Sequence, residues 1–86
     1  LKRYNKAKQE AQKALELAKN NDIKKTEYET YRILATIYDS LHDYRHSLEA
    51  FQRHTELKEQ VLNEETNKLV QELNKRYQTK EKEGLL

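Results

Sequence analysis

The sequence predicts an all-α fold, and three observations lead to that prediction. The 86 residues include one Gly and no Pro, whereas β-strands need turns rich in Gly, Pro, Asn and Asp. Apolar residues recur at spacings of three and four along most of the chain, which is the period of a helix face. Charged residues (37%) outnumber hydrophobic ones (35%). A chain of this size and composition builds only a thin core, so we expect one domain at most, completed by neighbouring repeats or by a second copy.

The first helix is expected to have a face of small residues. Six residues share this face at helical spacing: Tyr4, Ala7, Ala11, Ala14, Leu15 and Ala18. Alanine lets another helix approach closely, so this face is predicted to pack against a helix. The polar cluster Asn20–Asp22 leaves the helical conformation at low cost, and a turn is predicted there.

The second helix is expected to begin at about residue 27 and to be the central element of the core. Thr26 and Glu29 have the spacing of a capping box, in which each side chain bonds the other residue's backbone amide. The apolar residues that follow spread over more than half of the helix circumference. We therefore expect this helix to contact helices on two sides.

The third helix is expected to begin at Tyr44, capped by Asp43, and to be unusually long. From Tyr44 to Glu83 there is no Pro or Gly, so it could run for about 40 residues, or about 60 Å. If the helix breaks at all, Asn63–Thr66 is the only credible place for the break. Leu62, Thr66, Leu69, Leu73 and Arg76 follow a 4-3-4-3 spacing, typical of a weak coiled-coil seam. Self-association is accordingly predicted through four residues: Leu62, Leu69, Leu73 and Tyr77.

Charge alternates in sign along the chain. Residues 1–26 carry eight Lys or Arg against three Asp or Glu, residues 27–67 carry four against nine, and residues 68–86 carry five against three. Opposite charges on successive helices favour antiparallel packing, although exposed ion pairs contribute little each.

The second and third helices resemble a tetratricopeptide repeat, a two-helix unit of about 34 residues. The residues that carry the resemblance are Tyr31, Leu34, Ala35 and Tyr38, followed by Asp43, Tyr44, Ser47, Leu48 and Phe51. The chain departs from the family at His42, which stands where a Gly is usual and must adopt a left-handed conformation. It departs again at His54, where a small residue is usual. Glu59 replaces the Pro that normally ends the unit, so the last helix is free to continue.

The resemblance implies an organisation into three parts. Residues 1–26 would be the second helix and turn of a truncated unit, residues 27–60 a complete unit, and residues 61–86 a helical extension. The chain begins with Leu rather than Met, and we expect a fragment of a longer protein with further repeats upstream.

The C-terminal extension gives the chain a second, looser resemblance. A last repeat running into a charged helix is similar to the end of the repeat array in bacterial membrane-anchored sensors, in which the helix leads towards a histidine kinase or a helix-turn-helix output domain. This resemblance implies a role in signal transduction. It also implies the periplasmic side of a membrane-anchored protein; otherwise a cytoplasmic location is expected.

Catalysis, metal binding and cofactor binding are not predicted. There is no Cys and no Gly-rich phosphate loop, and the carboxylate pairs lie on a charged tail with no cleft around them. His42, His46 and His54 are interpreted as a turn residue, a surface residue and a helix-interface residue, because a zinc site would need additional carboxylates.

Nucleic acid and membrane are not expected partners. The basic residues of 1–26 are spread around a helix that should be packed, and the acidic middle of the chain would repel phosphate. No apolar run reaches 18 residues, so no direct membrane insertion is expected.

Binding of a protein or peptide is the predicted function, without catalysis. By resemblance, the binding groove is lined by the exposed face of the second helix: Glu29, Arg32, Thr36, Asp39 and Ser40. The alternative is a purely structural module whose C-terminal helix forms a homodimer. Loss of a dimer on removal of the residues after about 60 would distinguish self-association from a simple linker.

Overall fold

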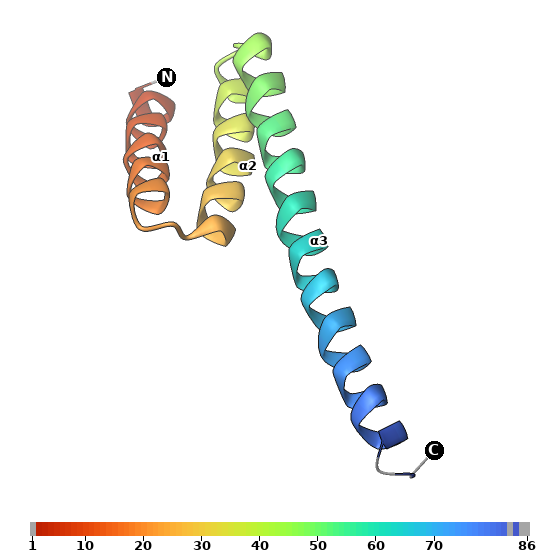
Figure 1. Ribbon diagram of the computed structural model, residues 1–86. Helices are drawn as coiled ribbons and strands as arrows, with labels where there is room; N and C mark the ends of the chain where they lie inside the picture. The colour runs from red at the N-terminus through yellow and green to blue at the C-terminus, as the bar shows by residue number, and fades with distance from the viewer. Residues whose placement is uncertain (1, 83, 85–86) are drawn as a thin grey trace.

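The computed structural model describes residues 2–82 and 84 and contains three helices, α1 (Lys2–Asn20), α2 (Lys24–Ser40) and α3 (Tyr44–Lys82). The prediction of an all-α fold is confirmed, since no strand occurs among these residues. α2 lies between α1 and α3, each helix runs antiparallel to the one before it, and α3 extends far past the other two (Figure 1). The molecule measures 67 × 23 × 14 Å.

Both turns use the same backbone geometry. Asp22 and His42 have φ angles of 53° and 61°, so His42 adopts the predicted left-handed conformation. The amide that follows each of them donates to a carbonyl five residues back, Ile23 to Ala18 and Asp43 to Tyr38, both at 2.9 Å. These bonds are typical of Schellman motifs, which end a helix by satisfying its last carbonyls. The predicted turn at Asn20–Asp22 is thereby confirmed.

The start of α3 agrees with the sequence prediction. The backbone amide of His46 donates to Oδ1 of Asp43 at 3.3 Å, and the other Asp43 oxygen lies 2.7 Å from Nδ1 of His46. Asp43 therefore caps the helix with one carboxylate oxygen and holds the His46 ring with the other.

The predicted start of α2 is wrong. α2 begins at Lys24, so Thr26 lies inside the helix and does not cap it. The carbonyl of Thr26 accepts a 2.7 Å bond from the Thr30 hydroxyl, and the N-cap position belongs to Ile23, whose side chain makes no capping bond. The reason is the left-handed Asp22: it reverses the chain so tightly that the next helix can begin two residues later.

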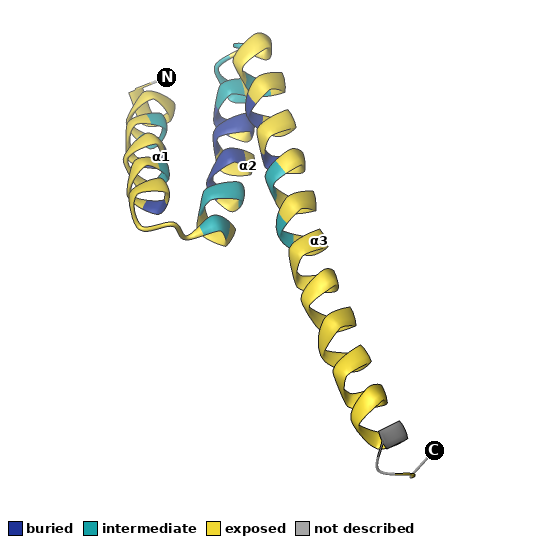
Figure 2. Ribbon diagram, viewed as in Figure 1, coloured by how far each residue is buried: buried dark blue, intermediate teal, exposed yellow. Residues whose placement is uncertain are grey.

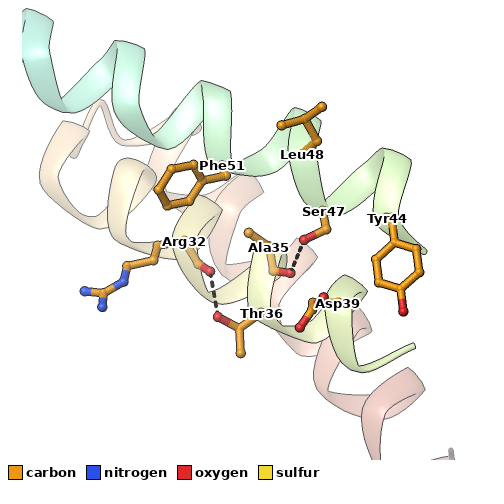
Figure 3. Close-up of a pocket in the computed structure, with 8 residues that line it drawn as sticks. All are labelled: Arg32, Ala35, Thr36, Asp39, Tyr44, Ser47, Leu48 and Phe51. Atoms are coloured by element: carbon orange, nitrogen blue, oxygen red, sulfur yellow. Dashed lines mark hydrogen bonds between the residues drawn. The ribbon is translucent and has the colours of Figure 1, made fainter. Parts of the chain in front are cut away.

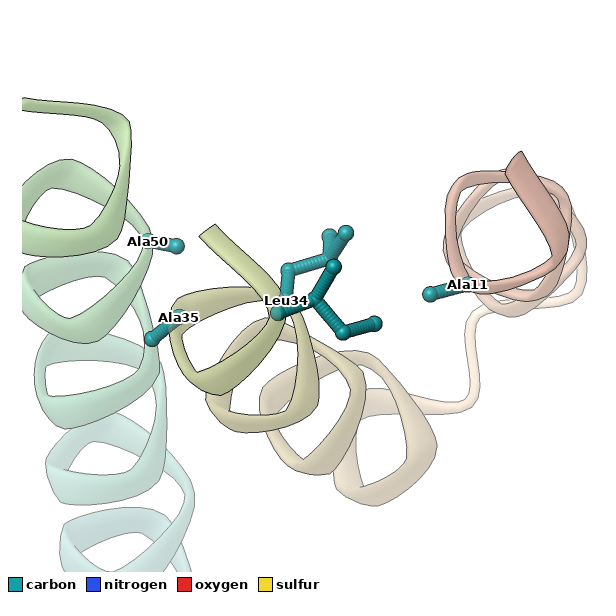
Figure 4. Packing of buried hydrophobic residues seen from close by; sticks show 5 residues of the cluster. Ala11, Leu34, Ala35 and Ala50 are labelled. Carbon is teal, nitrogen blue, oxygen red and sulfur yellow. The ribbon is translucent and has the colours of Figure 1, made fainter. Parts of the chain in front are cut away.

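The core is built from small residues at helix contacts. It contains one Leu, one Ile and three Ala: Ala11, Leu34, Ala35, Ile37 and Ala50. In Figure 4, Leu34 points from α2 towards Ala11 of α1, and Ala35 lies on the side of α2 that faces Ala50 of α3. α2 thus contacts helices on two sides, as predicted.

Two tyrosines of α2 connect all three helices. The buried ring of Tyr31 lies between Nζ of Lys19, 5.6 Å from its centroid, and the Arg53 guanidinium, at 5.9 Å. The hydroxyl of Tyr38 accepts a 3.3 Å bond from Nε2 of Gln12, and its ring stacks on His46 with centroids 5.2 Å apart.

In the part of the chain that the structure describes, no ion pair joins one helix to another. Within the described residues, the ion pairs are Lys24 with Asp22, Arg45 with Glu49, and His46 with Asp43. All are local along the chain. The helices do pack antiparallel, but the contribution expected from their opposite charges is not realised through paired side chains.

The packed face expected on α1 needs correction. Tyr4 and Ala14 were placed on that face by their spacing, but both are exposed, whereas Ala18 is only 2% exposed. The buried and half-buried residues of α1 that form this face are Ala7, Ala11, Leu15 and Ala18. The break allowed at Asn63–Thr66 does not occur, because α3 is continuous through these residues. Beyond residue 61 its described side chains are all exposed (Figure 2).

Candidate protein-binding groove

A groove runs between the exposed face of α2 and the first two turns of α3. Its volume is about 420 Å³, and eight residues line it (Figure 3): Arg32, Ala35, Thr36, Asp39, Tyr44, Ser47, Leu48 and Phe51. The first four belong to α2 and the others to α3. The groove is therefore a boundary between two helices of one hairpin.

The floor of the groove is fixed by a close approach of the two helices. The Ser47 hydroxyl donates a 2.7 Å bond to the carbonyl of Ala35 (Figure 3). This bond is possible because both side chains are small, so the two backbones lie close together. The hydroxyl of Thr36 donates to the Arg32 carbonyl at 3.3 Å, so it is already engaged within α2.

The two walls differ in chemistry. On the α3 side, Tyr44, Leu48 and Phe51 are 62%, 59% and 53% exposed. On the α2 side, Arg32 and Asp39 are exposed and have no ion-pair partner among the described residues. Arg32 lies at the Phe51 end and Asp39 at the Tyr44 end (Figure 3). The groove therefore has an apolar wall on α3 and a charged wall on α2, which is positive at Arg32 and negative at Asp39.

The groove continues towards the start of α2. A second hollow of about 450 Å³ shares Arg32 and Thr36 with the first and is lined in addition by Tyr28, Glu29, Ile33, His54 and Lys58. Nδ1 of His54 lies 2.7 Å from the Tyr28 carbonyl oxygen, and its ring packs edge-on against Tyr28. His54 is therefore a buried interface residue, as the sequence indicated.

The other two histidines also lie where the sequence placed them. His42 is in the turn with its Nδ1 2.9 Å from the Tyr44 hydroxyl, and His46 is exposed beside Asp43. In the described part of the chain, no three His, Asp or Glu side chains come together as a metal site would require. No described helix has the length and apolar character that crossing a membrane demands.

Four of the five residues predicted for the groove line it. Glu29, Arg32, Thr36 and Asp39 do so, whereas Ser40 is half-buried at the end of α2 and lines neither hollow. These four side chains of α2 face outward because the opposite face of the helix packs on both neighbouring helices.

Sequence reasoning missed the apolar wall. In the sequence, Tyr44, Leu48 and Phe51 are identified only as residues that carry the resemblance to the repeat, and no binding role is predicted for them. The sequence does contain a signal for this wall. The same helix has a second face, formed by Ser47, Ala50 and His54, that could pack on α2 in place of the apolar one. This face of smaller or polar residues is the one that packs on α2.

The predicted self-association residues lie on α3, away from the groove. Leu62, Leu69, Leu73 and Tyr77 are all exposed, and their spacing places them on one face of the helix.

Comparison with known proteins identifies no relative. The chain matches no protein-family model, no curated protein and no solved structure, so its function is inferred from the groove and from the exposed faces of its helices.

Proposed function

We propose that this chain is a noncatalytic protein-interaction module that binds an amphipathic helix of a partner protein in the α2–α3 groove. One observation carries the proposal: three large apolar side chains of α3 stand exposed side by side along the groove. Contiguous apolar surface beside polar residues is typical of interaction sites on proteins.

The dimensions of the groove fit a helix. Tyr44, Leu48 and Phe51 span eight residues of α3, or about 10 Å from first to last. This is the reach of apolar anchors at positions i, i+3 or i+4, and i+7 of a bound helix. Arg32 would receive an acidic side chain near Phe51, and Asp39 a basic one near Tyr44. The partner helix therefore has a preferred direction in the groove.

The finer assignment to tetratricopeptide repeats is part of this proposal. It is supported by the left-handed His42 and by the Asp43 cap. The small residue Ser47 at the helix contact supports it as well. We further propose, on the resemblance alone, a bacterial signalling protein as the parent, with α3 linking the groove to an output domain. An apolar span followed by a kinase or DNA-binding domain in the parent sequence would agree with this, and a parent lacking both would contradict it.

The binding proposal can be tested with a displayed library of helical peptides of about 16 residues. Peptides selected on the unmodified chain are titrated against Phe51→Asp, Arg32→Ala and Asp39→Ala. We expect Phe51→Asp to weaken binding at least tenfold, and each alanine variant by about two- to tenfold, because a charge-assisted bond is lost.

The matched control is Leu69→Asp, which places the same charge on the same helix outside the groove. This variant should bind the peptides as the unmodified chain does. Selection of no peptide, or equal weakening by Phe51→Asp and Leu69→Asp, would refute the proposal. Circular dichroism confirms that each variant is folded.

A further inference from the structure

The C-terminal half of α3 carries an apolar stripe that none of the described residues covers. Leu62, Leu69, Leu73 and Tyr77 are 49%, 55%, 51% and 60% exposed, and every residue from Leu62 to Lys80 is exposed (Figure 2). A single helix in water is marginally stable without tertiary contacts, so this half of α3 needs a packing partner.

The stripe has the spacing of a coiled-coil seam. Positions 55, 58, 62, 66, 69, 73, 76 and 80 follow each other at steps of three or four residues. A heptad seam alternates steps of three and four residues, but here two four-residue steps follow each other, from 58 to 62 and from 62 to 66. This additional step of four keeps the stripe on one side of a nearly straight helix. The seam is long but contains polar members: Thr55, Lys58, Thr66, Arg76 and Lys80.

We propose that the partner is a second copy of this chain, bound antiparallel through the seam. Charge provides the orientation. Residues 56–65 carry four Glu and one Lys, whereas residues 68–80 carry four Lys or Arg and one Glu. In an antiparallel pair, the acidic segment of each copy lies along the basic segment of the other. In a parallel pair, the two acidic segments lie side by side, and so do the two basic segments.

The apolar residues fix the register. With a two-fold axis between residues 67 and 68, Leu62 lies level with the partner's Leu73, and Thr66 with the partner's Leu69. The same register brings Arg76 level with the partner's Glu59. The overlap runs from residue 55 to residue 80, a length of about 39 Å.

A parallel pair is disfavoured by the cations of the seam. In register, it would place Lys58, Arg76 and Lys80 each against its own copy, in a setting where like charges repel across a partly desolvated contact. The antiparallel register removes all three of these contacts. It leaves an unfavourable approach on the flanks of the seam, where Glu65 of each copy comes to nearly the same level as Glu72 of the other, so that this approach occurs twice in the dimer.

The dimer does not require a partner in the groove. In the antiparallel arrangement the two grooves lie towards opposite ends of the pair, and the residues from Tyr44 to Phe51 lie outside the overlap. Lys58 is the one residue that belongs to the seam and also lines the second hollow. A monomeric chain would leave peptide binding intact, and a failure of peptide binding would leave the dimer intact.

The orientation can be tested with single cysteines because the chain has none of its own. Thr55→Cys and Lys80→Cys change exposed positions that the antiparallel register makes level with each other. The two variants are mixed in a glutathione redox buffer and separated without reduction. We expect the mixed disulfide between position 55 of one copy and position 80 of the other to exceed either homodisulfide at least tenfold. Predominance of the 55–55 homodisulfide, or no disulfide in any mixture, would overturn the proposal.

Sedimentation equilibrium provides the second measurement, on the full chain. Leu69→Asp should weaken dimerisation at least tenfold, and its control Gln71→Asp, which adds the same charge away from the seam, should change it less than threefold. Glu72→Lys should tighten the dimer about threefold, because it converts two like-charge approaches into attractions. A monomeric unmodified chain at several hundred micromolar, or a dimer insensitive to Leu69→Asp, would contradict the proposal.

Discussion

Two residues with left-handed backbones, Asp22 and His42, reverse the chain. Asp and His tolerate this conformation better than most residues other than Gly, which explains how a chain with one Gly makes two tight turns. The residue that follows differs between the turns. Asp43 caps α3 through its carboxylate, whereas Ile23 offers α2 no capping side chain. The first backbone amides of α2 therefore have fewer hydrogen-bond acceptors than those of α3.

Ile23→Ser should stabilise the fold by about 1 kcal/mol, because a hydroxyl at the N-cap position can accept a bond from an unpaired amide of the first turn. Little burial is lost, since Ile23 is 48% exposed. Urea denaturation followed by circular dichroism measures the change. The control is Ile23→Ala, which removes the same side chain without adding a cap. Equal midpoints for the two variants would show that the serine does not cap α2.

At the scale of the elements, close packing depends on small residues. Ala18 of α1 is almost fully buried, and Ala35 of α2 and Ala50 of α3 form the contact on the other side of the core. The helix axes therefore lie close together and the contacts bury little surface area. This agrees with the thin core that the composition predicts.

Ala18→Leu should destabilise the protein by about 1–3 kcal/mol, because the larger side chain would force α1 away from its neighbour. Ala14→Leu makes the same change four residues earlier on the same helix, but at an exposed position. It should alter stability by less than about 0.5 kcal/mol. Urea denaturation of both variants tests this contrast, and equal effects would show that the contact does not run along Ala11 and Ala18.

The sequence predicts what depends on local chemistry. The fold class, both turns, the Asp43 cap and the uninterrupted α3 follow from residue types and from the absence of Pro. The start of α2 could not be located in this way, because Ile23 has no capping side chain and the tight turn at Asp22 decides the boundary.

The candidate site was predictable only on one side. Periodicity placed Glu29, Arg32, Thr36 and Asp39 on the free face of α2, and they line the groove. α3 has two candidate faces at helical spacing, one of large apolar residues and one of small or polar residues. Which face packs depends on how closely the helices approach. The Ser47 bond to the Ala35 carbonyl sets that distance and leaves the large side chains, Phe51 among them, outside.

At the scale of the whole molecule, α3 connects two exposed surfaces. Its first turns form the groove with α2, and its C-terminal half carries the apolar seam, where every residue from Leu62 to Lys80 is exposed. The helix is continuous between them. A partner helix in the groove and a second copy on the seam would thus be joined by one rigid element of the chain.

The central claim is that the α2–α3 groove is the partner-binding surface, and an NMR titration tests it most directly. A selected peptide is added to the ¹⁵N-labelled chain, and amide shifts are followed residue by residue. We predict that the perturbed amides cluster on the free face of α2 from Glu29 to Asp39 and on α3 from Tyr44 to Phe51, with those beyond Leu62 unchanged. Perturbations confined to α1 or to the C-terminal half of α3 would contradict the claim.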